Sequence, residues 1–187
     1  PRLIALAPAL CLALIAPAHA ETLTGGKAKK LLFPADKAEA ILVTPSVLPA
    51  EQASVLQQVG ATQLYYGAIA ISPDEGMLVE ATVAAANYHS VEAASAAATA
   101  DCDTKRKGKT PCVVVAVIQP KGWKAKGLQL SSDATKGFKE AYPRKGGALA
   151  VSQVSGAWGV GVGADAAIAA CAAKSEKATD CAVIIQD

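Results

Sequence analysis

The chain contains the decapeptide GAIAISPDEG at residues 67–76 and a second version of it, GALAVSQVSG, at residues 147–156. Five of the ten positions are identical, and two more exchange one aliphatic side chain for another. A motif that recurs at long range within one chain indicates a repeated structural unit. The sequence therefore predicts two copies of one small domain.

The cysteine spacing supports this prediction. Cys102 and Cys112 are ten positions apart, and so are Cys171 and Cys181. In each pair an Ala-rich segment precedes the first Cys and a Val/Ile run follows the second. The copies are offset by 80 residues at the decapeptide and by 69 at the cysteines, so the second copy lacks eleven residues, which we place around residues 79–89.

Local patterns predict the order β-β-α-β in each copy. A turn sequence follows the decapeptide strand, Ser90 is suited to cap a helix, and continuous aliphatic runs indicate buried strands. The predicted elements are strands 65–72, 77–83 and 113–118 with helix 90–101, then strands 148–152, 157–162 and 182–186 with helix 164–174. A further strand at 40–44 and helices near 49–58 and 132–142 complete an α+β fold. It is mainly antiparallel, with helices packed on one shared sheet or on two facing sheets.

The N-terminus predicts export. Arg2 precedes an apolar run at residues 3–15, and Ala18-His19-Ala20 forms a small-x-small cleavage site before Glu21. If residues 1–20 are kept instead of cleaved, they form a membrane anchor, and the Gly25-Gly26-Lys27 linker sets its reach. The predicted parts are a signal peptide or anchor (1–20), an N-terminal extension (21–62), repeat unit 1 (63–120), a basic connecting segment with a helix (121–145) and repeat unit 2 (146–187).

Export to an oxidising compartment makes the four cysteines after residue 20 a disulfide framework. Four cysteines allow three pairings, and equivalent units favour Cys102–Cys112 with Cys171–Cys181. The alternative, a redox or metal site, lacks CxxC spacing, and His89 is the single histidine after residue 20. We therefore expect structural bridges and no metal site.

No catalytic residue is assigned. His89 could serve as a general acid or base, but we expect it to face solvent in the loop before a helix. The run GAWGVGVG at residues 156–163 resembles a nucleotide-binding loop. Its position after the hairpin turn instead favours glycines in a closely packed strand.

Positive charge is concentrated in one segment. Between residues 104 and 145 there are eleven Lys and Arg residues against Asp133 and Glu140. The densest group, Lys105, Arg106, Lys107 and Lys109, lies in the loop that the first disulfide would close. We predict that this patch binds anionic lipid headgroups or an acidic protein surface, and the alternative is an ordinary solvated loop. Export argues against nucleic acid as a partner.

The motif A-I-A-x-S-P-x-x-G at residues 68–76, the Ala-rich helix and the Cys before a Val-rich strand resemble a bacterial family of small secreted domains without assigned activity. SGAWG at residues 155–159 looks like that family's Thr/Ser-Gly-Ala-Trp-Gly, although Gln153 replaces its Pro. The tandem, with EATVAAAN at 80–87 and KRKGK at 105–109, is similar over nearly the whole of residues 21–187 to alphaproteobacterial proteins often labelled 5-aminolevulinate synthase. That label implies pyridoxal phosphate held by a Schiff-base Lys with an Asp and a His.

These observations predict an exported, non-enzymatic interaction or accessory module at the periplasmic face of the inner membrane. An accessory subunit of a membrane complex, such as a respiratory one, is one form of this function. The first alternative is a soluble periplasmic binder of a small anionic ligand, with its site between the two copies. The second is the synthase activity. We expect no cofactor.

Overall fold

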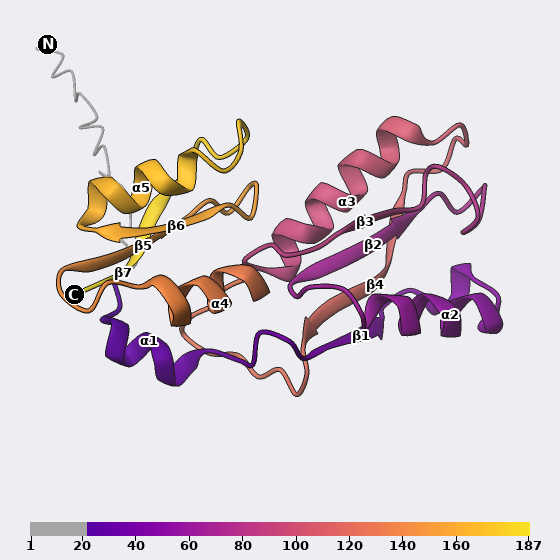
Figure 1. The fold of residues 1–187 in the computed structure, drawn as a ribbon. Helices are drawn as coiled ribbons and strands as arrows, with labels where there is room; N and C mark the ends of the chain where they lie inside the picture. Colours follow the sequence, from indigo (N-terminus) through magenta and orange to yellow (C-terminus); the bar gives the residue numbers. More distant parts are fainter. Residues whose placement is uncertain (1–21) are drawn as a thin grey trace, which may run out of the picture.

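The computed structural model describes residues 22–187, and the predicted export signal lies outside the described residues. Two sheets lie side by side along the length of the molecule, each with a helix above it (Figure 1). The elements are α1 Gly25–Leu31, β1 Ala38–Leu42, the 3-10 turn η1 Pro45–Val47, α2 Ala50–Gly60, β2 Gly67–Ile71, β3 Val83–Ala85, α3 Val91–Lys105, β4 Val113–Pro120, α4 Ser132–Ala141, β5 Gly147–Val151, β6 Trp158–Val162, α5 Ala164–Ala172 and β7 Ala182–Gln186.

The strands form a four-stranded sheet with order β1-β4-β2-β3 and a three-stranded sheet with order β6-β5-β7. Every pairing between these strands is antiparallel. The predicted α+β class and the β-β-α-β order of both copies are confirmed. We call the part built on the four-stranded sheet the first half and the part built on the three-stranded sheet the second half.

The two halves share their strand register. The β2–β4 pairing shifts between Ile69 and Ala70, and the β5–β7 pairing shifts between Leu149 and Ala150, which is the same place in the decapeptide. Ala70 pairs with Val114, as Ala150 pairs with Val183. The offset of 80 residues therefore holds for the first strand of each copy, and the offset of 69 residues holds for the last.

The predicted strand 77–83 is wrong. Residues 77–82 form bends and a turn, in which Thr82 donates its N–H to the Val79 carbonyl and its hydroxyl to the Met77 carbonyl, at 3.0 and 2.6 Å. The second strand of the first copy is β3 instead. Ala70 of β2 pairs with Val83 of β3, and in the second copy Ala150 of β5 pairs with Gly159 of β6. The eleven residues absent from the second copy are thus not one block at 79–89: four are missing before the second strand and seven after it.

The predicted Gly25-Gly26-Lys27 linker is also wrong, because these residues begin α1. The Thr24 hydroxyl caps the helix by accepting the Lys27 N–H at 3.4 Å. Ala28 is fully buried in the core of the second half, where burial of the helix stabilises it. The N-terminal extension is therefore divided: α1 packs on the second half, while β1 joins the sheet of the first half.

Small residues allow the helices to approach the sheets closely. Ala94 and Ala98 of α3 are fully buried with Ala68 and Ala70 of β2. In the second half, a Cβ added at Gly159 would overlap the α5 backbone around Cys171. The glycine run at 156–163 thus includes glycines of a closely packed strand, as the sequence predicts.

Helix α4 joins the halves. Ser132 at its start exchanges two hydrogen bonds with Tyr65, one through its N–H and one through its hydroxyl, both 3.0 Å long. Further along, the fully buried Phe138 packs in the core of the second half with Leu149. The helix is anchored on one half and packed on the other, so it fixes their arrangement.

Both predicted disulfides are confirmed: Cys102–Cys112 and Cys171–Cys181, each with Cα atoms 6.1 Å apart. Each ties a helix to the segment before the next strand. Two structural disulfides are typical of a protein from an oxidising, exported compartment. Within residues 22–187, no helix is both long enough and apolar enough to cross a membrane.

Candidate anion-binding surface

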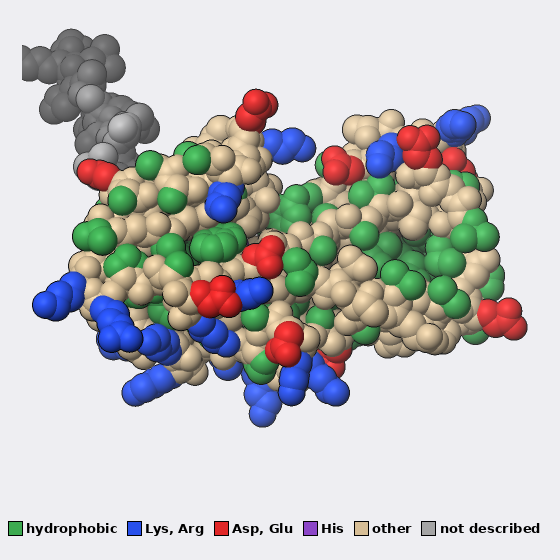
Figure 2. Space-filling view, viewed as in Figure 1, with side chains coloured by type: hydrophobic (Ala, Val, Ile, Leu, Met, Phe, Trp, Pro, Cys, Tyr) green, Lys and Arg blue, Asp and Glu red, His purple; other side chains and the backbone are tan. Residues whose placement is uncertain are grey.

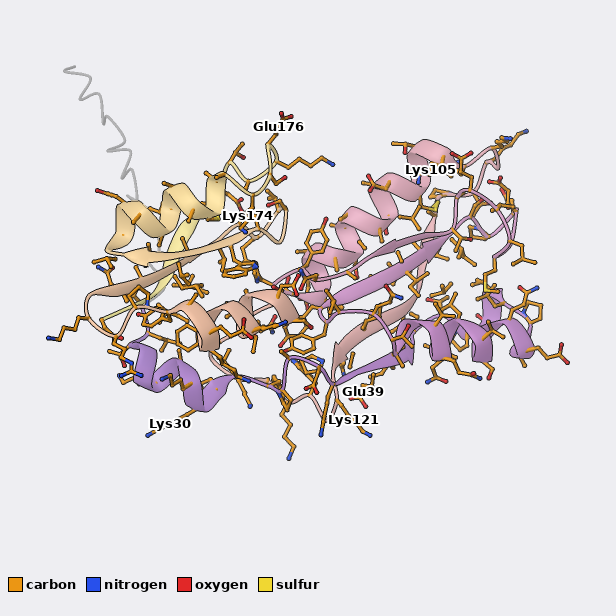
Figure 3. All side chains as sticks on the ribbon, viewed as in Figure 1. Lys30, Glu39, Lys105, Lys121, Lys174 and Glu176 are labelled. Carbon is orange, nitrogen blue, oxygen red and sulfur yellow. A yellow bond between two sulfur atoms is a disulfide. The ribbon has the colours of Figure 1, made fainter. Side chains whose placement is uncertain are left out.

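The predicted basic loop extends from the end of α3, at the upper right of Figure 3, where Lys105 is labelled. Carboxylates of the β2–β3 turn hold its backbone. Glu75 accepts the N–H groups of Lys107 and Gly108 at 2.9 and 3.0 Å, and Asp74 accepts that of Thr110 at 2.8 Å. These hydrogen bonds lower the pKa of Glu75 and of Asp74, so both carboxylates stay charged beside the loop.

Arg106 has a structural role in this loop. Its Nε donates to Asp103 at 2.6 Å, and its Nη1 donates to the carbonyls of Gly108 and Lys109 at 2.7 and 3.1 Å. The hydrogen bond from the Cys112 N–H, followed by that from Arg106, lowers the pKa of Asp103. Three carboxylates thus offset most of the charge of Lys105, Arg106, Lys107 and Lys109.

A stronger concentration of positive charge lies elsewhere, on what we call the basic face, formed by residues 25–37 and 121–145. These two segments carry eleven cations against Asp36, Asp133 and Glu140, whereas the other described residues carry six cations against twelve carboxylates. Lys136, Asp133 and Glu140 of these segments also line the space between the halves. Blue side chains gather along the lower edge of Figure 2, and Lys30 and Lys121 lie on that side in Figure 3, away from Lys105. The cations are Lys27, Lys29, Lys30, Lys37, Lys121, Lys124, Lys126, Lys136, Lys139, Arg144 and Lys145.

Contacts between distant segments assemble this face. The Lys126 ammonium lies 3.8 Å from the ring centre of Phe33, which follows α1. The Lys121 N–H donates to the Lys37 carbonyl at 2.9 Å. The segments before β1 and after β4 are therefore neighbours, and their lysines share one surface.

A pocket of about 480 Å³ opens in the basic face between α1 and the end of α4. Lys29, Lys139 and Arg144 line it together with Glu140 and Asp187. Burial, with a contribution from the nearby Asp187 carboxylate, raises the pKa of Tyr142 in its wall to about 12. The neutral Tyr142 hydroxyl donates to the Gly147 carbonyl at 2.7 Å, which leaves the three cations as the charged groups suited to an anion.

The sequence prediction used only the cations after residue 104 and missed those of α1. A signal for them exists: Thr24 is suited to an N-cap, and Ala28 and Leu31 are spaced for one helix face with lysines between them. That pattern spans only seven residues, and the two glycines at its start favour a linker.

His89 does not face solvent, and that prediction is wrong. It is 1% exposed, its Nδ1 accepts the Ser131 N–H at 3.1 Å, and its Nε2 lies 3.1 Å from the Ala157 carbonyl. Because Nδ1 accepts the Ser131 N–H, it must be unprotonated. The ring proton is therefore on Nε2, which donates it to the Ala157 carbonyl. Burial is the main influence on the ring and lowers its pKa. His89 is a neutral bridge between the halves.

The cavity beside His89 has a volume of about 200 Å³, and its walls contain no Lys, Asp or Glu. A Schiff-base enzyme of the kind implied by the synthase label needs such groups beside the histidine. Among the described residues, no three His, Cys, Asp or Glu side chains are grouped so as to hold a metal ion.

Comparison with known proteins gives no relative: no protein-family model, curated protein or solved structure matches the chain. The resemblance to the secreted bacterial family stays a prediction.

Proposed function

We propose that this chain is an exported, non-enzymatic interaction module that docks on anionic lipid headgroups through its basic face. The observation that carries the proposal is the charge division: eleven cations against three carboxylates in the two segments that form the basic face, and six against twelve in the other described residues. A protein with this division orients itself on a negatively charged surface, because one side is attracted and the remainder is repelled.

The magnitudes are sufficient for reversible binding. Each Lys or Arg close to an anionic bilayer contributes about 1 kcal/mol at physiological ionic strength, and the attraction falls off within a Debye length of about 10 Å. When the basic face lies on the membrane, the exposed lysines of α1 are within this distance of the lipid headgroups. The pocket lined by Lys29, Lys139 and Arg144 offers a place for a headgroup phosphate.

The predicted export signal and the two disulfides support a periplasmic location at the inner membrane. There the module would act as an accessory component beside a membrane complex. Binding of a purely anionic ligand between the halves has less support, because the space between them contains as many carboxylates as cations. The synthase activity lacks a lysine beside His89.

Co-sedimentation with lipid vesicles tests the proposal. The purified protein should sediment with vesicles that contain about one third phosphatidylglycerol and should remain in solution with neutral phosphatidylcholine vesicles. Replacing Lys27, Lys29 and Lys30 with Ala should weaken binding about 100-fold at low salt, since each charge contributes about 1 kcal/mol.

The matched control replaces Lys105, Lys107 and Lys109 with Ala, which removes the same charge from the disulfide-closed loop. This variant should bind the vesicles nearly as well as the unaltered protein. Equal losses in the two variants, or no sedimentation with anionic vesicles, would contradict the proposal. Binding that persists unchanged at about 1 M salt would contradict its electrostatic basis.

A further inference from the structure

A cleft of about 430 Å³ opens between the two halves, a size typical of sites for small molecules. Figure 2 shows the hollow between the halves, with side chains of both charges beside it. The halves touch at its wall, where Gly156 adopts a φ of +71° and a Cβ added to it would lie 2.7 Å from the Asn87 carbonyl oxygen. The contact of Gly156 with Asn87 therefore forms part of the cleft wall where the halves meet.

Trp158 forms the aromatic part of the cleft. It is half-buried at the start of β6, and its ring lies so close to Gly137 of α4 that a Cβ there would overlap it. Glycine is unfavourable inside a helix, so its presence here reflects the space that the tryptophan takes. The Lys174 ammonium lies 5.6 Å from the centre of the ring.

Charged groups of both signs line the same cleft: Lys136 and Lys174, with Asp133 and Glu140. The one ion pair among the described residues is Arg106 with Asp103, so these four groups do not pair with one another. Asp133 is held in place by Asn87, whose amide nitrogen donates to its carboxylate at 2.9 Å. Figure 3 shows Lys174 at the end of α5 nearer to the first half.

We propose that this cleft binds a zwitterion of about dipeptide size. Its carboxylate would lie beside Lys136 and Lys174, its ammonium beside Glu140 and Asp133, and an apolar side chain against Trp158. A simple anion would meet two carboxylates, and a simple cation would meet two lysines. A ligand with both charges is complementary to both sets.

Fluorescence titration tests the site, because the chain has two tryptophans and a Trp123→Phe variant leaves Trp158 as the reporter. The dipeptide Gly-Leu should change its emission saturably below about 10 mM. N-acetyl-Gly-Leu-amide, which has the same size and no charge, should bind at least about tenfold more weakly. Isothermal titration calorimetry on the unaltered protein should likewise show that Gly-Leu binds more tightly than N-acetyl-Gly-Leu-amide.

Charge variants locate the binding. Lys174→Ala and Glu140→Gln should each weaken Gly-Leu binding by about tenfold, while the control Lys177→Ala, an exposed lysine that does not line the cleft, should leave it unchanged. The proposal is overturned if neither method detects Gly-Leu binding, or if the blocked dipeptide binds as well. It is also overturned if inorganic phosphate or N-acetylglucosamine binds more tightly than Gly-Leu.

Discussion

His89 illustrates how one side chain can join two halves of a fold and restrict the conditions under which they stay joined. Protonation would place a hydrogen on Nδ1, where the ring accepts the Ser131 N–H. It would also bury a positive charge in a site that is 1% exposed. The folded chain therefore requires the neutral ring.

This requirement predicts a pH dependence of stability. Burial lowers the pKa of folded His89 below the ordinary value of 6.5, so below about pH 6.5 the unfolded chain binds a proton that the folded chain does not. The free energy of unfolding should fall as the pH drops from about 7.5 to 5, by at most about 1.4 kcal/mol per pH unit. Urea unfolding at several pH values measures it.

The control is His89→Gln, which keeps one donor and one acceptor but does not titrate. It should lose most of this slope. The carboxylates with lowered pKa values, Asp74, Glu75, Asp103 and Asp180, lose their contribution only as the pH falls below their ordinary range, near 4. A slope between pH 5 and 7.5 that is equal in the variant and the unaltered chain would contradict the role given to His89.

Sequence could not predict the burial of His89. Its neighbours Asn87, Tyr88 and Ser90 are typical of a solvated loop before a helix, and the residues that bury it, Ser131 and Ala157, are 42 and 68 positions away. A single histidine carries no periodic pattern that would reveal such contacts.

At the scale of elements, the two disulfides close loops of equal length in equivalent places. Loop-closure entropy gives about 2–3 kcal/mol for each. The paired replacements Cys102→Ser with Cys112→Ser, and Cys171→Ser with Cys181→Ser, should therefore lower the free energy of unfolding by similar amounts. Urea unfolding measures both, and reducing the unaltered protein is the control. A large loss from one pair and none from the other would contradict the equivalence of the halves.

The element order was predictable because the repeat supplied each observation twice. Cysteine spacing, the decapeptide and the Ala-rich helices agree between the copies, so the fold class and both bridges follow from them. The wrong elements lie where one copy has no counterpart. Residues 77–82 have a strand-like composition, but the Thr82 hydroxyl closes a turn on Met77. The lysines of α1 reach the basic face only because Ala28 is buried in the second half.

At the scale of the whole molecule, the predicted basic loop and the basic face lie on different sides. Sequence placed the partner site at Lys105, Arg106, Lys107 and Lys109 because they are adjacent in the chain. In the folded chain, carboxylates of the β2–β3 turn and α3 surround that loop. Lysines distant in sequence gather instead along the lower edge of the molecule in Figure 2. The lysines that are adjacent in the sequence and the lysines that share the basic face are therefore different sets.

Lysine footprinting tests the central claim most directly. The protein is acetylated briefly with and without vesicles containing phosphatidylglycerol, and the extent of modification at each lysine is read by mass spectrometry. Docking through the basic face predicts that vesicles protect Lys27, Lys29, Lys30, Lys121 and Lys124 and leave Lys105, Lys107, Lys109 and Lys177 as reactive as before. Protection of the second set with none of the first, or equal reactivity throughout, would contradict the account.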